Sequence, residues 1–512
     1  MLKKGFAVLL CLAAGILAAA AYELLPSHVA VVYNSRSELS RRMAGEYARV
    51  RGVPAENLIA LDCPKGNEIS RGEYEQTIHQ PLLKIAREKQ WWKPSGIASA
   101  PMMDRKIYVL LLMADMPMKI RHEQPVPPSG QELNQQTTDR ASVDSELALM
   151  AFDNYEKKGW LGNPYFMKNE DFVGSGLPLF LVNRIDGLTE ATCMRMIRQP
   201  AAVEANGLWG WAVVDRGGPY GEGDKWMDIV FKQVRDAGIP AYLDDWPQTL
   251  PAMFPLSRDT ALYFGWYTEN ANGPFLDPSF RFRPGAVAAH LHSFSASDFK
   301  TPGRGWCSAL LEKGADVTMG NVYEPFLGAN HRFDILTERL LAGYSVAEAS
   351  AMSMAVLSWQ GVVFGDPLYR PYARMKSMDV RPSDENKYFQ GWWASKVQFE
   401  NRWNDRLARL RDSAAKAPSS FLYEALALEC MYGKDYPQAR KMLAAALVAP
   451  AGDRDRARLL MESLLMDRAT GGDAVCLQRL VGVKNLLSSS PFLPALEEWL
   501  KRLEPPPAPE KK

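Results

Sequence analysis

Two histidines and a serine lie together in Ala288-Ala-His-Leu-His-Ser-Phe, where their types suit hydrolysis. Ser293 beside His290 or His292 supplies a hydroxyl and an imidazole, and Glu269, Glu324 or Asp366 could orient that ring. In a strand the two histidines share one face, which also suits two metal ligands with a carboxylate as the third. Hydrogen bonding that supports loops at a sheet edge is the structural alternative. Three roles therefore stay open: a Ser/His hydrolytic site, a metal-assisted site and structural support.

Other polar and aromatic residues stand where strand-like apolar runs end. Consecutive strand ends meet at one edge of a parallel sheet, so we expect these residues to line a cleft. The candidates are Trp266, Tyr267, Asn321, Glu324, Asp366, Arg184 and Asp215. Arg184 is also expected to pair with Asp186, close to the end of the same run. No Walker or dinucleotide phosphate motif and no Cys–His zinc spacing occurs, so we predict no cofactor and assign no metal ligand.

The elements that position these residues alternate as β and α segments. Strand-like runs cover 28–33, 57–62, 106–114 and 179–185 in a first series. A second series covers 208–214, 241–243, 261–266, 286–294 and 317–321, followed by a helix over 333–359. Amphipathic stretches lie between the runs. This alternation predicts an α/β fold of two mostly parallel-sheet subdomains, spanning 22–200 and 201–373.

The remainder of the chain is predicted to be helical. After a linker at 374–391, helices are expected over 392–413, 421–432, 436–447, 454–465 and 474–487, within a region ending near 503. Alanines between larger apolar residues in 436–447 resemble a tetratricopeptide helix. Because stacked repeats need about three units for independent stability, we expect this region to dock on the α/β part. The tail 504–512, rich in proline, is predicted to be disordered.

The first 21 residues are typical of a secretion signal. Lys3 and Lys4 precede an apolar stretch, and Ala19-Ala-Ala offers a cleavage site. We therefore predict an exported protein, periplasmic or extracellular, with no stable membrane anchor once the signal is removed. The chain of 512 residues has a net charge of +1, so nothing favours binding to nucleic acid.

Residues 205–372 resemble the caspase-like clan of cysteine peptidases, especially its gingipain and clostripain branches. The resemblance rests on Gly314-Ala315, Gly320 and Gly365-Asp366-Pro367. It implies a catalytic His after one strand and a Cys nucleophile after the next. Here those places hold Trp266 and His292-Ser293, so the dyad is missing. Cys307 is the nearest cysteine, and we interpret it as a buried structural thiol.

The chain to about 372 is also similar to an exported bacterial family of unassigned function. The shared phrases are Gly52-Val-Pro, Ala141-Ser-Val-Asp-Ser, Arg184-Ile-Asp-Gly, His290-Leu-His-Ser-Phe and Asn321-Val-Tyr-Glu-Pro. We predict a non-peptidase protein that binds a protein or polymer at the former substrate cleft. The alternative is a hydrolase rebuilt around His290, His292 and Ser293. A third hypothesis, a protein or peptide partner held by the helical C-terminus, predicts that deletion after about 390 leaves the cleft intact.

Overall fold

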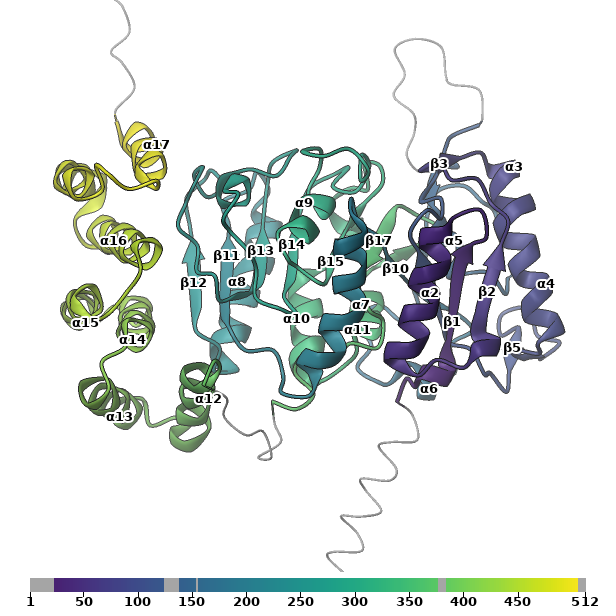
Figure 1. Cartoon of the computed structure of the whole chain (residues 1–512), viewed down its shortest axis with the longest axis horizontal. Helices are drawn as coiled ribbons and strands as arrows, with labels where there is room; N and C mark the ends of the chain where they lie inside the picture. Colours follow the sequence, from purple (N-terminus) through teal and green to yellow (C-terminus); the bar gives the residue numbers. More distant parts are fainter. Residues whose placement is uncertain (1–22, 124–137, 153–154, 376–383, 505–512) are drawn as a thin grey trace, which may run out of the picture. The chain divides into compact units, whose positions relative to one another are not determined.

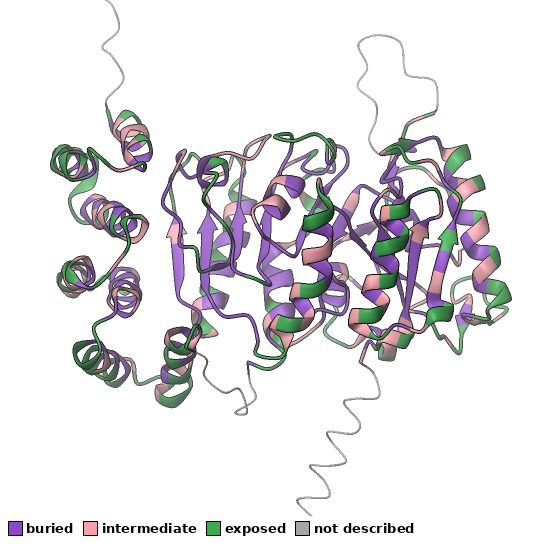
Figure 2. Cartoon of the chain, viewed as in Figure 1, coloured by how far each residue is buried: buried purple, intermediate pink, exposed green. Residues whose placement is uncertain are grey.

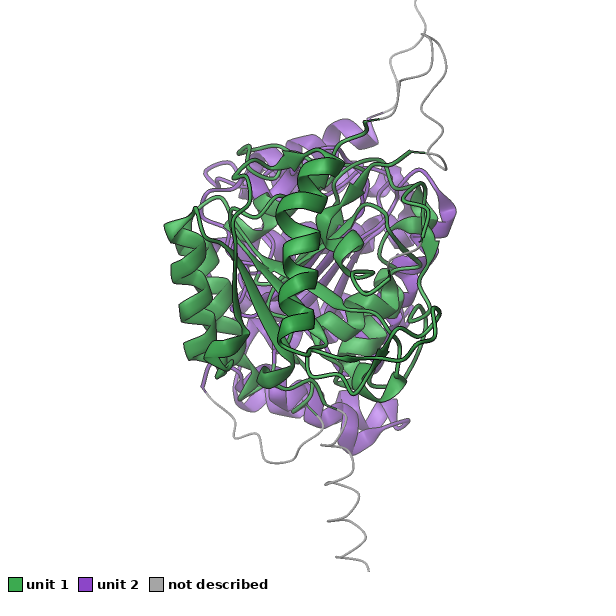
Figure 3. Cartoon of the chain, turned by 90° about the vertical axis from the view of Figure 1, so that its right-hand side faces the viewer, with its two compact units in different colours: residues 1–207, 293–312, 316–378 green, residues 208–292, 313–315, 379–512 purple. Residues whose placement is uncertain are grey.

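The computed structural model describes residues 23–123, 138–152, 155–375 and 384–504, which form two compact units. Unit 1 comprises residues 1–207, 293–312 and 316–378, and unit 2 comprises 208–292, 313–315 and 379–512 (Figure 3). The expected signal peptide and nearly all of the expected tail lie outside the described residues. Among the residues described, no helix is long and apolar enough to span a membrane.

Unit 1 contains a six-stranded sheet in the order β15-β17-β10-β6-β1-β2. Its neighbours are parallel except for β15 with β17. The strands are β1 (Val29–Asn34), β2 (Leu58–Leu61), β6 (Val109–Met113), β10 (Leu181–Ile185), β15 (Thr318–Asn321) and β17 (Gly361–Phe364). The sequence places 317–321 in the second series, yet this strand pairs in the sheet of unit 1, because the chain returns to that unit after residue 292.

Helices cover both faces of this sheet. Val29 and Val31 face a core shared with α2 and α7, whereas Ala30 and Val32 face a core shared with α4. This alternation follows from the two-residue period of a strand buried on both sides. The helices are α2 (Glu38–Arg51), α3 (Arg71–Tyr74), α4 (Gln80–Glu88), α5 (Val143–Leu147), α6 (Phe172–Ser175), α7 (Glu190–Glu204), α9 (Cys307–Glu312), α10 (Phe333–Ala342) and α11 (Val346–Ser353).

Short elements complete unit 1. Three small sheets join β3 (Glu68–Ile69), β7 (Lys119–Ile120) and β8 (Ala141–Ser142); β4 (Lys93–Pro94) and β5 (Met102–Met103); β9 (Leu161–Gly162) and β16 (Val356–Leu357). Single turns of helix are η1 (Pro26–His28), η2 (Ala55–Asn57), η3 (Glu75–His79) and η5 (Leu327–Ala329). The helix predicted over 333–359 is divided, because Gly343 ends α10 in a left-handed conformation and Ser345 with Glu348 forms a capping box that starts α11.

Unit 2 contains a parallel four-stranded sheet in the order β12-β11-β13-β14. The strands are β11 (Trp211–Asp215), β12 (Ala241–Asp244), β13 (Thr260–Gly265) and β14 (Val287–His290), with α8 (Gly221–Asp236) and η4 (Gly273–Leu276) between them. In Figure 2 these strands are almost wholly buried. The predicted strand 286–294 ends at His290, since the Leu291 N–H makes the last bond to the Gly265 carbonyl before the chain turns.

A series of helices packs against β12 and completes unit 2 (Figure 1). They are α12 (Lys387–Phe399), α13 (Trp403–Lys416), α14 (Ser420–Tyr432), α15 (Tyr436–Val448), α16 (Asp453–Leu486), which breaks at Gly472, and α17 (Leu493–Leu503). Aromatic pairs join them to the sheet and α8, such as Trp211 with Phe421 and Phe231 with Tyr432. The predicted fold class, α/β sheets followed by a helical region, is confirmed.

Candidate functional site

The four parallel strands of unit 2 end in one row of residues. Asp244, Asp215, Gly265 and His290 are partners in register across β12, β11, β13 and β14. The strand order reverses direction at β11 and β13, and open α/β sheets bind ligands beside such a switch point. The sequence-predicted residues Asp215, Trp266, Tyr267 and His290 are therefore brought to one edge of one sheet.

Trp266 fills the crevice at this switch point. The side chain is only 1% exposed. A Cβ atom added at Gly218 or at Gly223 would overlap the indole ring, so the ring lies directly against both glycines. Its Nε1 donates a hydrogen bond of 2.8 Å to Asp224 Oδ1, which also accepts the N–H groups of Gly217 and Gly218. The place where a ligand would approach the loop after β11 is thus occupied by the chain itself.

His290 is held inside a hydrogen-bonded network. The ring is 1% exposed, and its Nε2 accepts the backbone N–H of Thr268 at 3.2 Å. Its Nδ1 lies 3.1 Å from the Tyr263 hydroxyl, which lies 3.4 Å from Asp215 Oδ2. Burial lowers the pKa of His290 well below its ordinary value, with His292 adding to the shift. The neutral ring has both nitrogens engaged, which is a structural arrangement.

His292 and Ser293 lie beyond the end of strand β14. Because β14 ends at His290, the two histidines do not share a strand face, and the expectation of a paired strand geometry is wrong. The His292 ring is partly buried with its centroid 4.4 Å from that of Tyr267. Ser293 is buried and starts the segment that belongs to unit 1. Glu269 is exposed in the loop after β13.

Two carboxylates that stand side by side in the row are fully buried. Asp215 accepts the Leu250 N–H at 3.3 Å, and Asp244 accepts the Tyr242 hydroxyl at 3.4 Å. Burial, with the neighbouring Asp244, raises the pKa of Asp215 well above its usual range. Burial, with Asp245, raises the pKa of Asp244 to about 7. Asp244 was not singled out in the sequence, although it follows a short apolar run as Asp215 does.

The remaining predicted cleft residues lie in unit 1 and have structural partners. Arg184 is fully buried and pairs with Asp144, not with Asp186 as expected. Asp186 pairs instead with Lys300. Arg184 meets Asp144 because α5 packs against β10, whereas Asp186, which follows the end of that strand, is met by Lys300.

Asp366, Asn321 and Glu324 also bond within unit 1. Asp366 accepts hydrogen bonds from Tyr47 and Arg51. Asn321 donates to Asn330 at 2.6 Å, and Glu324 accepts the Phe326 N–H at 3.3 Å. Within the described ranges, no group of three or more His, Cys, Asp or Glu side chains is placed to hold a metal ion.

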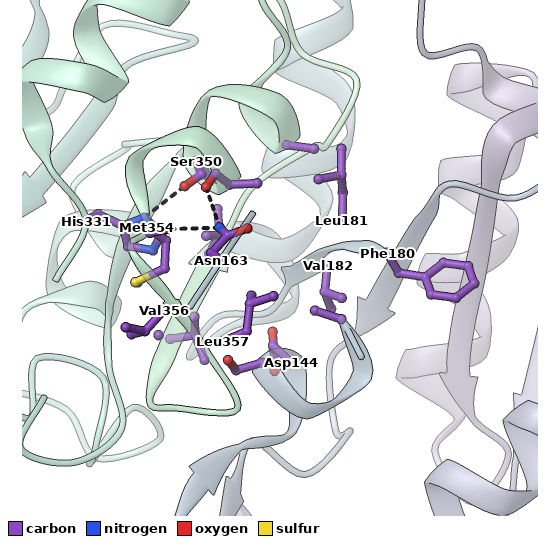
Figure 4. Close-up of a pocket in the computed structure, with 17 residues that line it drawn as sticks. Asp144, Asn163, Phe180, Leu181, Val182, His331, Ser350, Met354, Val356 and Leu357 are labelled. Atoms are coloured by element: carbon purple, nitrogen blue, oxygen red, sulfur yellow. Dashed lines mark hydrogen bonds between the residues drawn. The ribbon is translucent and has the colours of Figure 1, made fainter. Parts of the chain in front are cut away.

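Neither Cys307 nor the small cavity in the described part of unit 1 offers a reactive site. Cys307 is buried, and this burial raises its pKa to about 12. A cavity of about 70 Å³ lies beside Asn163, His331, Ser350 and Met354 (Figure 4). Ligand sites usually measure about 300 Å³ or more, so this space is too small for a substrate. Burial lowers the pKa of His331 to about 4, which leaves that ring neutral.

A larger cavity of about 510 Å³ lies in unit 2, next to the row of strand ends. Its lining combines the loop after β12, the loop after β13 and helix α17: Pro247, Gln248, Thr249, Tyr267, Thr268, Glu498, Lys501 and Arg502. Of these, the sequence analysis identified only Tyr267. The others were missed because no local pattern connects residues 247–249 with residues 498–502.

Packing of α17 against unit 2 creates this cavity. Trp499 is fully buried and stacks on Trp246 with ring centroids 5.6 Å apart. Arg502 donates to the Thr249 carbonyl at 2.9 Å, and Glu498 accepts the Ala252 N–H at 2.8 Å. The expected docking of the helical region is confirmed. Deletion after about 390 would remove one wall of the cavity, so the cleft is not independent of the helices.

A second cavity of about 460 Å³ lies between the end of β12 and the helices α14–α16. It is lined by Leu243, Asp245, Met431, Tyr432, Lys434, Tyr436, Leu465, Arg468, Ala469 and Asp473. Arg468 is already paired with Asp245 and Asp473, and its guanidinium lies 4.0 Å from the Trp246 ring centroid. Because the charge of Arg468 is compensated within the protein, this second cavity is a weaker candidate for a binding site than the cavity beside Tyr267.

Comparison with known proteins gives little further information. No family model and no curated protein matches the chain. A solved structure titled "Structure of Protease" is similar with a TM-score of 0.37 and 10% identity, covering 69% of this chain and 80% of that one.

Proposed function

We propose that this chain is an exported, non-peptidase protein on a caspase/gingipain-like α/β scaffold that binds a protein or polymer at the carboxyl edge of the unit 2 sheet. The packing of Trp266 carries the proposal. This residue stands where the resemblance implies the catalytic His, and its ring occupies the switch-point crevice against Gly218 and Gly223. A side chain in that crevice excludes a scissile bond from it.

The chemistry of the nearby groups supports binding rather than hydrolysis. A cysteine nucleophile requires a thiolate with a base within hydrogen-bond reach. Cys307 is buried with its pKa raised to about 12, and it belongs to the core of unit 1. His290 has both ring nitrogens engaged by Tyr263 and Thr268, so neither is available as a general base. The hydrolase alternative then depends on His292 and Ser293 alone.

The cavity beside Tyr267 is the binding place that the geometry favours. It adjoins the strand ends, and its volume lies within the usual range for ligand sites, about 300–1,000 Å³. Both loops that line it leave the carboxyl ends of strands of the same sheet. Binding there requires no change at Trp266 or His290.

Blocking the cavity tests this proposal. Gln248 is an exposed lining residue, and Gln248→Trp would place an indole in the opening. Gln478→Trp, at an exposed position of α16 outside the lining, is the matched control. Affinity electrophoresis in gels containing gelatin, polyglutamate, polygalacturonate or dextran should show retardation of the wild type and the control by at least one polymer.

The blocked variant should lose that retardation, with at least tenfold weaker binding as the rough expectation from an occluded site. Equal retardation of both tryptophan variants would contradict binding at this cavity. Retardation of none of the proteins by any polymer would contradict the polymer-binding function itself.

A further inference from the structure

The cavity beside Tyr267 carries one uncompensated positive charge. Glu498 uses its carboxylate to accept the Ala252 N–H and to pair with Arg502. Lys501 is exposed and makes no ion pair with any residue in the described part of the chain. Two cations thus line the cavity with one anion, and the surplus lies on Lys501.

Arg502 adds a second, buried donor at the same wall. Its side chain is 9% exposed. One terminal nitrogen donates to the Thr249 carbonyl and to Glu498, while its Nη1 has no hydrogen-bond partner in the described residues. A buried guanidinium N–H without a partner destabilises the protein, because it has lost its hydrogen bonds to water without forming a new one. A bound oxygen atom, directly or through a water, would satisfy it.

Aromatic rings continue from the cavity along the strand ends. Tyr267 lines the cavity, and its ring centroid lies 6.5 Å from that of Tyr220 and 4.4 Å from that of His292. Tyr220 is 57% exposed, which is unusual for so large a ring. Flat rings beside hydrogen-bonding groups suit a ligand with one flat C–H face and many hydroxyl groups.

The lining contains no aliphatic side chain except the ring of Pro247. Peptide-recognition sites combine backbone pairing with apolar pockets for anchoring side chains. The Thr249 and Thr268 hydroxyls already bond to Asn272 and to the Asn270 carbonyl. The lining instead offers an amide, an ammonium and a guanidinium group, from Gln248, Lys501 and Arg502. This composition favours a sugar over a peptide.

We propose, building on the binding function above, that the cavity takes an acidic oligosaccharide whose uronate carboxylate is bound by Lys501 and whose ring lies on Tyr267. The carboxylate supplies the negative charge that compensates the ammonium group of Lys501. The sugar hydroxyls form hydrogen bonds with Gln248 and Arg502. Both cations come from α17, so the helical region completes the site rather than forming a separate one.

Titration calorimetry on residues 22–512 tests the proposal with three probes. They are a galacturonate hexamer, the same hexamer with its carboxylates methyl-esterified, and a hexaglutamate peptide. The acidic sugar should bind, its binding should weaken at higher salt, and esterification should weaken it about tenfold or more, as expected for loss of a charge-assisted contact. Hexaglutamate should bind more weakly than the acidic sugar.

Two charge-removing variants assign the contact. Lys501→Gln should weaken the acidic sugar about tenfold and leave the esterified sugar unchanged. Lys441→Gln, at an exposed position of α15 outside the lining, should behave as wild type. Tyr267→Leu should weaken both sugars to a similar extent, because the stacking face is common to them.

The outcomes separate this inference from the function on which it rests. Equal binding of both sugars, or no effect of Lys501→Gln, overturns uronate recognition. Tight binding of hexaglutamate alone, dependent on Lys501, overturns the sugar assignment while leaving a binding cavity in place. Absence of binding by all three probes overturns the inference, and the polymer panel with Gln248→Trp then decides the proposed function independently.

Discussion

Replacing Gly218 by alanine should destabilise unit 2, whereas the same replacement at Gly221 should not. The two glycines lie in the same segment, neither has a positive φ, and only Gly218 lies against the Trp266 ring. An added Cβ at Gly218 overlaps the indole, while at Gly221 nothing lies within 4 Å. The pair therefore isolates the packing of Trp266.

The expected magnitudes follow from the two surroundings. Overpacking a well-filled site costs about 1–3 kcal/mol, and displacing the indole would also disturb the Trp266–Asp224 hydrogen bond. Gly221→Ala, at the first turn of α8, should change the free energy of unfolding by between zero and about 1 kcal/mol in the stabilising direction. A difference of about 2 kcal/mol between the variants is the expected result.

Urea unfolding followed by circular dichroism measures this difference, and hydrogen exchange of the α8 amides locates it in unit 2. Gly218→Ala should lower protection across α8, since Gly223 on that helix also lies against the ring. If the two variants unfold with the same free energy, within about 0.5 kcal/mol, the indole does not fill the crevice and the reasoning fails.

Three further predictions concern buried groups. Cys307, with a pKa raised by burial to about 12, should resist iodoacetamide at pH 8 in the folded protein and react after denaturation; labelling without unfolding would contradict its burial. The raised pKa of Asp244, about 7, means that its stabilising contribution is present below about pH 4 and is lost as the pH rises toward 7. Asp244→Asn should therefore gain stability relative to wild type over this range, by up to about 4 kcal/mol in thermal unfolding, and a pH-independent difference would refute the shift. Trp499→Ala should cost about 3–5 kcal/mol in unit 2, because the ring is buried on Trp246, and a loss below about 1 kcal/mol would contradict the docking of α17.

The strands and the helical region were predictable because their signals are local. Residues 107–113 are almost continuously apolar, as expected for a strand covered on both faces, and 436–447 sets alanines between larger apolar residues, as in a packed helix. The division of the predicted helix 333–359 at Gly343 was missed, although the glycine and the Ser345–Glu348 capping box mark it. The pairing of β15 with the sheet of unit 1 could not be predicted, because the order of strands in a sheet depends on the tertiary path of the chain and not on a local pattern.

Only those residues of the candidate site that lie at the ends of strands could be predicted from the sequence. Asp215, Trp266 and His290 follow apolar runs and meet at one edge, as expected. The end of β14 at His290 was not readable, since the alternating pattern of the sequence continues past the last ladder bond of that strand. Lys501 reaches the site through the tertiary contact of Trp499 with Trp246, which no sequence period encodes.

Hydrolysis assays on purified residues 22–512 decide between a binding site and a catalytic one. Peptide, ester and amide substrates would be assayed with added divalent metals and with chelator, beside Ser293→Ala and His292→Ala. We expect the wild type to show no turnover above either variant under any condition. Turnover that both substitutions abolish would contradict it and establish a rebuilt catalytic site, with chelator sensitivity assigning that site to a metal.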